Sequence, residues 1–118
     1  MSSLGMKMDS LAKALAILII EENDYSYVDK IGYAPSKDLA LFYIREALRD
    51  LHSLIRSGEV EARGARELLE NLDFEKVYRE LEGIGRLETR EGLREVLSML
   101  ASKALTLSAS VIKSQGGG

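Results

Sequence analysis

The segment SKDLALFYIREALRDLHSLIRS, residues Ser36–Ser57, decides the fold, because both its ends and its buried face can be read from the residues. Ser36 follows Pro35 and offers a side-chain acceptor to the free amides of a first helical turn. Gly58 tolerates the left-handed conformation that ends many helices. Between these ends, apolar residues recur at the spacing of one helical face. The sequence predicts an amphipathic helix that buries Ala40, Leu41, Ile44, Ala47, Leu48, Leu51, Leu54 and Ile55.

The opposite face of this helix carries a basic row, consisting of Arg45, Arg49, His52 and Arg56. The 4-3-4 spacing confines the row to an arc of roughly 60°, with Phe42 at its edge. Like charges four residues apart repel unless something anionic lies against them, so nucleic acid is one candidate ligand. The alternative is a solvated face on which Glu46 and Asp50 neutralise the arginines.

Composition restricts the chemistry of the chain. It has 118 residues, of which 46% are hydrophobic and 30% charged, as in a soluble globular domain. It contains no cysteine and one histidine, which excludes disulfides and thiol catalysis and argues against a transition-metal site. We expect no cofactor. The net charge of −3 means that any nucleic-acid binding must be local, weak or assisted by a partner.

A helix is predicted over residues 11–22, and it is apolar on nearly every side. Two interpretations remain open. The helix is central to a bundle, or it presents a partner surface, for which Ile17 and Ile19 are the candidates. The apolar run 14–20 is too short to span a bilayer and has acidic flanks unlike those of a signal peptide. We therefore expect a cytoplasmic protein without membrane contact.

The next thirteen residues, NDYSYVDKIGYAP (Asn23–Pro35), are predicted to form a long connection. They contain three of the five tyrosines: Tyr25, Tyr27 and Tyr33. These side chains can close the mouth of a bundle, or they can offer rings to a protein partner or to nucleic-acid bases. Val28 and Ile31 would anchor the connection and favour the first interpretation.

Three further helices are predicted in the second half of the chain. A weak helix interrupted by Gly64 follows Gly58, and a short helix over 74–82 buries Phe74, Val77, Tyr78 and Leu81 before Gly83 ends it. A long helix over 89–113 carries the apolar positions Leu93, Leu97, Leu100, Ala104, Leu107 and Val111. Packing of this helix on 36–57 predicts an all-α bundle of four to five helices, one domain over 1–118 with flexible ends at 1–9 and 114–118.

No catalytic or metal-binding constellation stands out. Acidic pairs such as Glu80 and Glu82 are predicted to face water, and the Glu-x-x-His pattern of di-metal bundles is absent. Arg45 and His52 lie on one helical face about 10 Å apart. An arginine followed by a histidine in this way resembles the signature of the helical HEPN ribonucleases, so an RNA-cleaving enzyme remains a minor hypothesis.

Residues 11–57 resemble a known family. The apolar first helix, the segment YSYVDKIGYAPSKD (Tyr25–Asp38) and the following amphipathic helix are together similar to the small subunit of the archaeal subtype I-A CRISPR interference complex, a Cascade-like assembly of antiviral defence. Some members of that family carry a strand-containing insertion, whereas residues 59–71 here are short and helical in character.

The resemblance implies a non-enzymatic subunit that contacts copies of itself and other subunits of the complex. It also implies weak binding of guide RNA or of the target or displaced DNA strand, for which the basic row and Phe42 are the candidate residues. A small-molecule substrate is not expected. The alternative from a different class is a helical adapter or oligomeric scaffold that binds no nucleic acid.

Overall fold

A computed structural model describes residues 7–116, which contain six helices and no strand. The helices are α1 (Asp9–Glu22), α2 (Ser26–Gly32), α3 (Lys37–Arg56), α4 (Arg63–Glu70), α5 (Phe74–Gly85) and α6 (Arg90–Gly116). The prediction of an all-α fold is confirmed. The number of helices differs, because the segment expected to be a connection forms α2.

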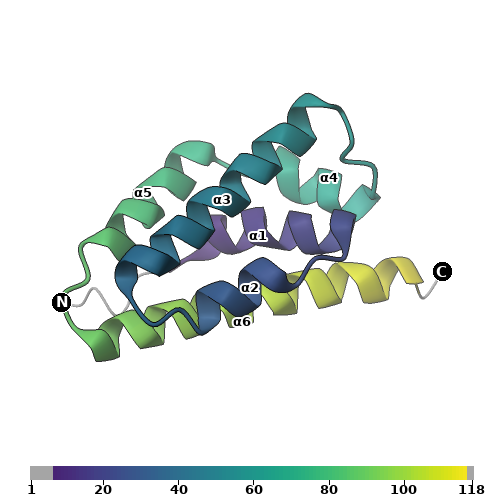
Figure 1. Ribbon diagram of the computed structural model, residues 1–118. Coiled ribbons are helices and arrows are strands. Elements are labelled where there is room, and N and C mark those ends of the chain that lie inside the picture. Colours follow the sequence, from purple (N-terminus) through teal and green to yellow (C-terminus); the bar gives the residue numbers. More distant parts are fainter. Residues whose placement is uncertain (1–6, 117–118) are drawn as a thin grey trace.

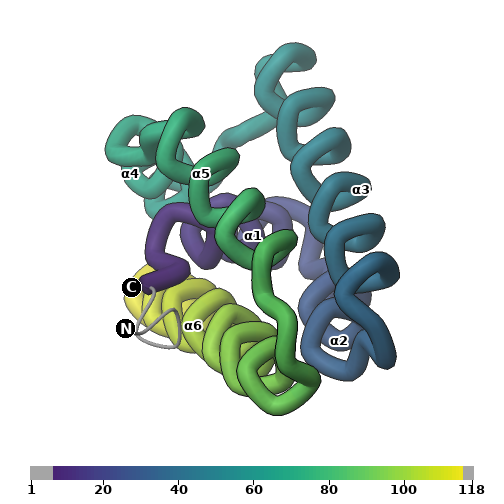
Figure 2. The backbone as a smooth tube through the Cα atoms, turned by 90° about the vertical axis from the view of Figure 1, so that its left-hand side faces the viewer, coloured from purple at the N-terminus to yellow at the C-terminus, as the bar shows by residue number. Residues whose placement is uncertain are grey.

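Helix α1 lies at the centre of the molecule and packs against α3, α4, α5 and α6 (Figures 1 and 2). Figure 2 shows α6 below α1, α4 and α5 above it, and α3 with α2 to its right. Ile17 and Ile19 are at most 1% exposed, so the interpretation of these two side chains as a partner surface is wrong. The helix is apolar all round because it has neighbours of its own chain on every side.

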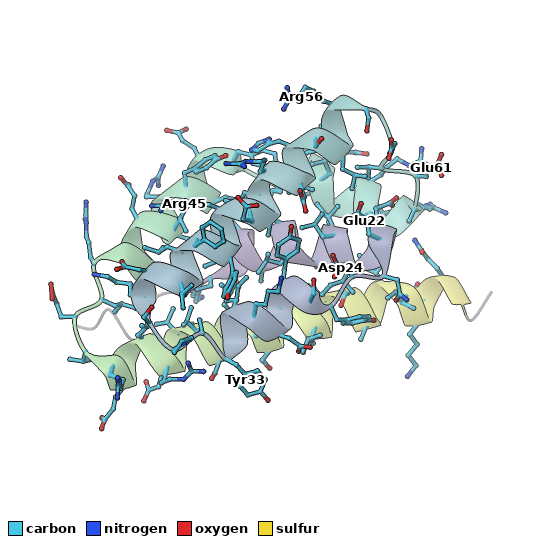
Figure 3. All side chains as sticks on the ribbon, viewed as in Figure 1. Glu22, Asp24, Tyr33, Arg45, Arg56 and Glu61 are labelled. Carbon is cyan, nitrogen blue, oxygen red and sulfur yellow. The ribbon has the colours of Figure 1, made fainter. Side chains whose placement is uncertain are left out.

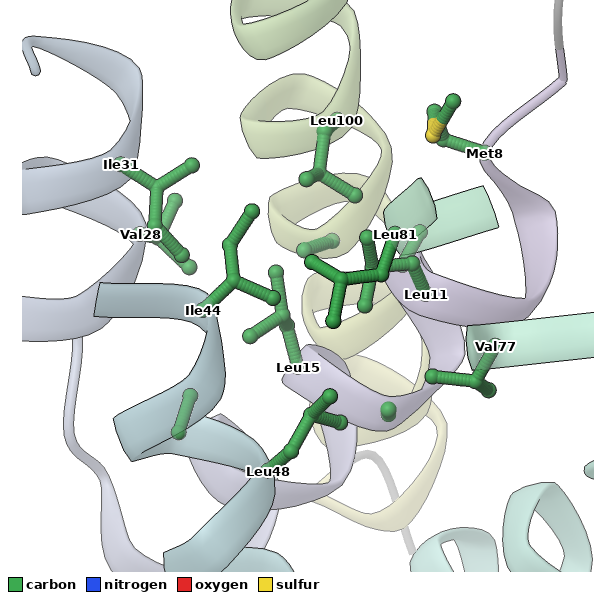
Figure 4. Packing of buried hydrophobic residues seen from close by; sticks show 14 of the residues in the cluster. Met8, Leu11, Leu15, Val28, Ile31, Ile44, Leu48, Val77, Leu81 and Leu100 are labelled. Carbon is green, nitrogen blue, oxygen red and sulfur yellow. The ribbon is translucent and has the colours of Figure 1, made fainter. Parts of the chain in front are cut away.

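The core is built outward from α1 (Figure 4). Leu11 and Leu15 meet the buried side chains of the surrounding helices, among them Ile44 and Leu48 of α3, Val77 and Leu81 of α5 and Leu100 of α6. Met8 is fully buried as well and Asp9 begins α1, so the predicted flexible end 1–9 is wrong at these two residues. Residues 1–6 lie outside the described residues.

Both predicted ends of α3 are confirmed. The Ser36 hydroxyl accepts a hydrogen bond from the Leu39 amide at 3.2 Å, as an N-cap does. Gly58 has φ +71°, and its amide donates to the Ile55 carbonyl while the Glu59 amide donates to the Leu54 carbonyl, each at 3.1 Å. This pair of bonds is the Schellman motif, which satisfies the last carbonyls of the helix.

Helix α2 replaces the predicted connection. The Asp24 carboxylate accepts a hydrogen bond from the Ser26 amide at 2.9 Å, and Val28 is buried against the core. At the other end, the guanidinium of Arg94 on α6 donates to the Gly32 carbonyl and to the Ala34 carbonyl, the latter at 2.7 Å. A cation at a helix C-terminus is favourable, so Arg94 fixes α2 between α3 and α6.

The remaining helices differ from the predictions mainly at their ends. Helix α5 continues past Gly83 to Gly85. Helix α6 continues to Gly116, so the predicted flexible end is wrong at residues 114–116, and residues 117–118 lie outside the described residues. Helices α3 and α6 do not pair with each other as expected, because both pack on α1 and α2. Gly64 is a close-contact residue of α4, since a Cβ there would lie 2.1 Å from Cγ1 of Val111.

Among the described residues, α6 is the one helix long and apolar enough to cross a membrane by length and composition. A core helix of a globular protein passes the same test. The first half of α6 is such a helix, with Leu97, Leu100 and Ala104 fully buried. The second half leaves Leu105 and Ile112 each 39% exposed, which is an uncovered apolar strip.

Candidate nucleic-acid interface

The three arginines of the basic row are exposed on the outer face of α3. Figure 3 shows Arg45 and Arg56 on the side of α3 that faces α5. Phe42 is 54% exposed and meets Tyr43 edge to face, with ring centroids 5.8 Å apart. The arginines and Phe42 are therefore accessible to a ligand, as the sequence indicated.

His52, unlike the arginines, is held by side chains of α5. Its Nε2 and the Tyr78 hydroxyl are 2.8 Å apart in a hydrogen bond, and its ring packs on Phe74 with centroids 4.9 Å apart. The histidine is thus part of the contact between α3 and α5. One ring nitrogen is already engaged, which favours a structural role over the acid/base role that a ribonuclease would need.

Helix α5 adds two residues that the sequence analysis missed, Tyr78 and Arg79. Both line a groove between α3 and α5, opposite Arg45, with Leu41, Leu81 and Gly85 also at its surface. Tyr78 was expected to be buried, yet it is 44% exposed, because its hydroxyl is hydrogen-bonded to His52 and its ring lies beside the His52 ring instead of entering the core. No feature of the sequence indicated that α5 would lie beside the basic row.

Carboxylates accompany the arginines. Glu46 lies 3.4 Å from Arg49, and Glu75 lies 3.9 Å from Arg79, while Glu82 also lines the groove. The Arg49 side chain is nevertheless 76% exposed. Such solvent-exposed pairs contribute about 0–1 kcal/mol, so a phosphate can displace the carboxylate at little cost. The arginines are therefore partly neutralised, as the alternative of a solvated face predicted, but only by weak ion pairs.

The other side of α3 is acidic. Figure 3 shows Glu22, Asp24 and Glu61 of the neighbouring segments to the right of α3, away from Arg45. Partial burial, reinforced by the neighbouring Asp50 and Asp24, raises the pKa of Glu22. Charge is thus segregated across the helix, which explains how a chain of net charge −3 presents a local basic face.

The three tyrosines of the Asn23–Pro35 segment have different surroundings. The Tyr27 hydroxyl donates to Asp50, and burial together with this bond raises the pKa of Tyr27. Tyr27 therefore ties α2 to α3 and is not a free partner-binding residue. Tyr25 and Tyr33 are 41% and 83% exposed, so both remain available.

Glu80, which was predicted to face water, and Glu21, at the end of α1, both have structural partners. Glu80 accepts hydrogen bonds from the Ser10 and Leu11 amides at 3.2 and 2.8 Å, so it caps α1 from α5, and burial raises its pKa. Glu21 accepts from the Glu61 and Ala62 amides at 3.1 and 2.7 Å, just before α4. The prediction that Glu80 faces water is therefore wrong, because its side chain is partly buried against the start of α1. No cluster of three or more metal-ligating side chains occurs within residues 7–116.

Comparison with known proteins decides the family. The model of a family described as CRISPR-associated protein (Cas_Csa5) matches residues 14–111. The chain belongs to this family. It is also similar to an uncharacterized protein of Archaeoglobus fulgidus, with 52% identity over 113 residues that cover 96% of this chain and 94% of the relative. No solved structure matches the chain. Family membership confirms the CRISPR association indicated by the first helix and the Tyr25–Asp38 segment.

Proposed function

We propose that this chain is a non-enzymatic small subunit of a CRISPR interference complex, and that the α3–α5 face supports binding of one nucleic-acid strand. The observation that carries the proposal is the exposed row Arg45, Arg49 and Arg56 in a member of a CRISPR-associated family. Guide RNA and the target or displaced DNA strand share the phosphate backbone that arginines bind. The partners are other subunits of the complex and further copies of this chain.

Weak binding by a single copy fits such a role. The acidic side of α3 repels a polyanion, so the strand is confined to the side that carries the arginines. When copies and a large subunit hold the same strand, each further contact becomes intramolecular, and a weak site contributes useful affinity. The acidic net charge therefore suits a subunit of an assembly better than a free-standing nucleic-acid binder.

The test reverses the charge of the row. Arg49→Glu with Arg56→Glu should weaken binding of single-stranded DNA and RNA of every sequence. The salt dependence of log K should flatten by roughly 0.7 for each lost phosphate contact. Fluorescence anisotropy at low salt, on the chain alone and with its complex, measures both quantities.

A matched control makes the same change of charge elsewhere. Arg63→Glu with Lys113→Glu places it on exposed positions of α4 and α6. This control should bind nearly as well as the unmodified chain. Equal affinities for the row variant and the unmodified chain, in both settings, would remove the row from the account and favour a scaffold without nucleic acid.

A further inference from the structure

His52 and Tyr78 form a flat aromatic plate at the groove between α3 and α5. Their ring planes are parallel within 4°, with centroids 6.3 Å apart, while Nε2 and the hydroxyl oxygen are 2.8 Å apart. Because one atom of each ring system lies only 2.8 Å from the other, the two parallel planes cannot be further apart than this distance. Stacked rings are separated by roughly 3.5 Å. The two rings therefore lie side by side, and neither covers the face of the other.

The plate is supported from within the fold. Phe74 packs against the His52 ring at 4.9 Å with a tilt of 33°, and the hydrogen bond to His52 orients Tyr78. Tyr78 is still 44% exposed and lines the groove. A ring held in place before a ligand arrives loses little conformational entropy on binding.

Charged side chains line the groove together with Tyr78. Arg45 lines it from α3, and Arg79, Glu75 and Glu82 line it from α5. Aromatic and cationic side chains along one groove are typical of single-strand binding, in which bases stack on the rings and arginines bind the phosphates. Duplex nucleic acid has its base faces already stacked and can use only the arginines.

We propose that Tyr78 is a stacking platform for an unpaired nucleobase, and that Arg79 and Arg45 hold the adjoining phosphates, so that the groove selects a single strand over a duplex. This inference rests on the proposed function and adds to it a subsite on α5. When the strand binds, a phosphate replaces Glu75 as the partner of Arg79, from which Glu75 lies 3.9 Å away.

The experiment separates base stacking from phosphate binding. The full-length chain is titrated with a short labelled oligothymidylate, with an abasic oligomer of the same length, and with a duplex. The unmodified chain should bind the oligothymidylate roughly 5- to 150-fold more tightly than the abasic oligomer, the range expected for one stacked base. This comparison needs no variant and is independent of folding.

Variants then assign the preference. Tyr78→Leu should abolish the difference between the two oligomers and leave abasic and duplex binding unchanged, while Tyr78→Phe should retain the preference because it keeps the ring. Arg79→Gln should weaken both single-stranded ligands together. A thermal melt of each variant verifies folding.

Each contrary result has a distinct meaning. Equal binding of the abasic oligomer and the oligothymidylate by the unmodified chain, with the dependence on Arg49 and Arg56 intact, overturns the stacking subsite and leaves the proposed function standing. A preference for bases that survives Tyr78→Leu places the stacking residue elsewhere and overturns the assignment. Absence of binding to all three ligands overturns both proposals.

Discussion

Glu80 stabilises the start of α1 from a different helix. The two oxygens of its carboxylate accept hydrogen bonds from the Ser10 and Leu11 amides, two of the groups that a helix N-terminus leaves without partners. Burial raises the pKa of this carboxyl, and the two backbone bonds oppose that effect. The site therefore favours the protonated form of Glu80 more than water does.

This shift predicts a pH effect that depends on Glu80. An acid whose pKa is raised on folding contributes stability that is present below its usual pKa of 4.5 and lost as the pH rises through the folded value. The difference in unfolding free energy between the unmodified chain and Glu80→Gln should therefore fall between acidic and neutral pH. Thermal melts of both proteins across that range measure it. A difference that grows with pH would contradict the assignment.

Residues whose partners are local in sequence were predictable, and those with distant partners were not. Ser36 and Gly58 act within one or two turns of α3, so both of its ends follow from the residues alone. Glu80 caps an amide seventy positions away, and His52 is held by Tyr78 on another helix. Helical periodicity gives the face on which a residue lies but not the element that covers that face.

At the scale of elements, the burial of α1 means that a charge introduced on this helix should unfold the protein. Ile17→Glu introduces a carboxylate into a site that is 0% exposed, which should cost several kcal/mol and unfold the chain. Tyr33→Glu is the matched control at a position 83% exposed, and it should leave the melting temperature nearly unchanged. A folded Ile17→Glu protein that has lost only its self-association would restore the partner surface.

The contact of α4 with α6 supplies another prediction. Alanine raises helix propensity relative to glycine by about 1 kcal/mol, so Gly64→Ala would stabilise an isolated α4. In the protein the added methyl would lie 2.1 Å from Cγ1 of Val111, and the resulting overpacking should destabilise the fold by about 1–3 kcal/mol. Denaturant melts measure the change. Val111→Ala in the same chain should recover part of the loss.

Among the elements, the sequence predicted best the helices with one apolar face. The buried positions of α3 are those expected, apart from Ile55, which is only partly buried. α1 has no polar face, so its sequence fits a central helix and a partner surface equally well, and only its neighbours decide. The seven residues of α2 include a glycine and depend on Arg94 of α6, a partner that no local pattern reveals.

At the scale of the whole molecule, the central feature is the segregation of charge across α3. On the side towards α5, α3 carries Arg45, Arg49 and Arg56, and α5 adds Arg79, with Glu46 and Glu75 as weak partners. On the other side, Asp50 of α3 lies near Glu22 at the end of α1. A strand bound on the first side is repelled by the second, so its path is limited to α3 and α5. Tyr33 and the exposed strip of α6 lie off α3 and α5, outside this path.

The most direct test of this account is to map where a nucleic-acid strand touches the chain. A single-stranded oligonucleotide containing 4-thiothymidine is cross-linked by ultraviolet light to the chain, alone and in its complex, and the modified peptides are identified by mass spectrometry. The account predicts cross-links on α3 and α5, at or beside Phe42 and Tyr78, that disappear in the Arg49→Glu, Arg56→Glu protein. Cross-links confined to α2 or α6, or none in either setting, would contradict it.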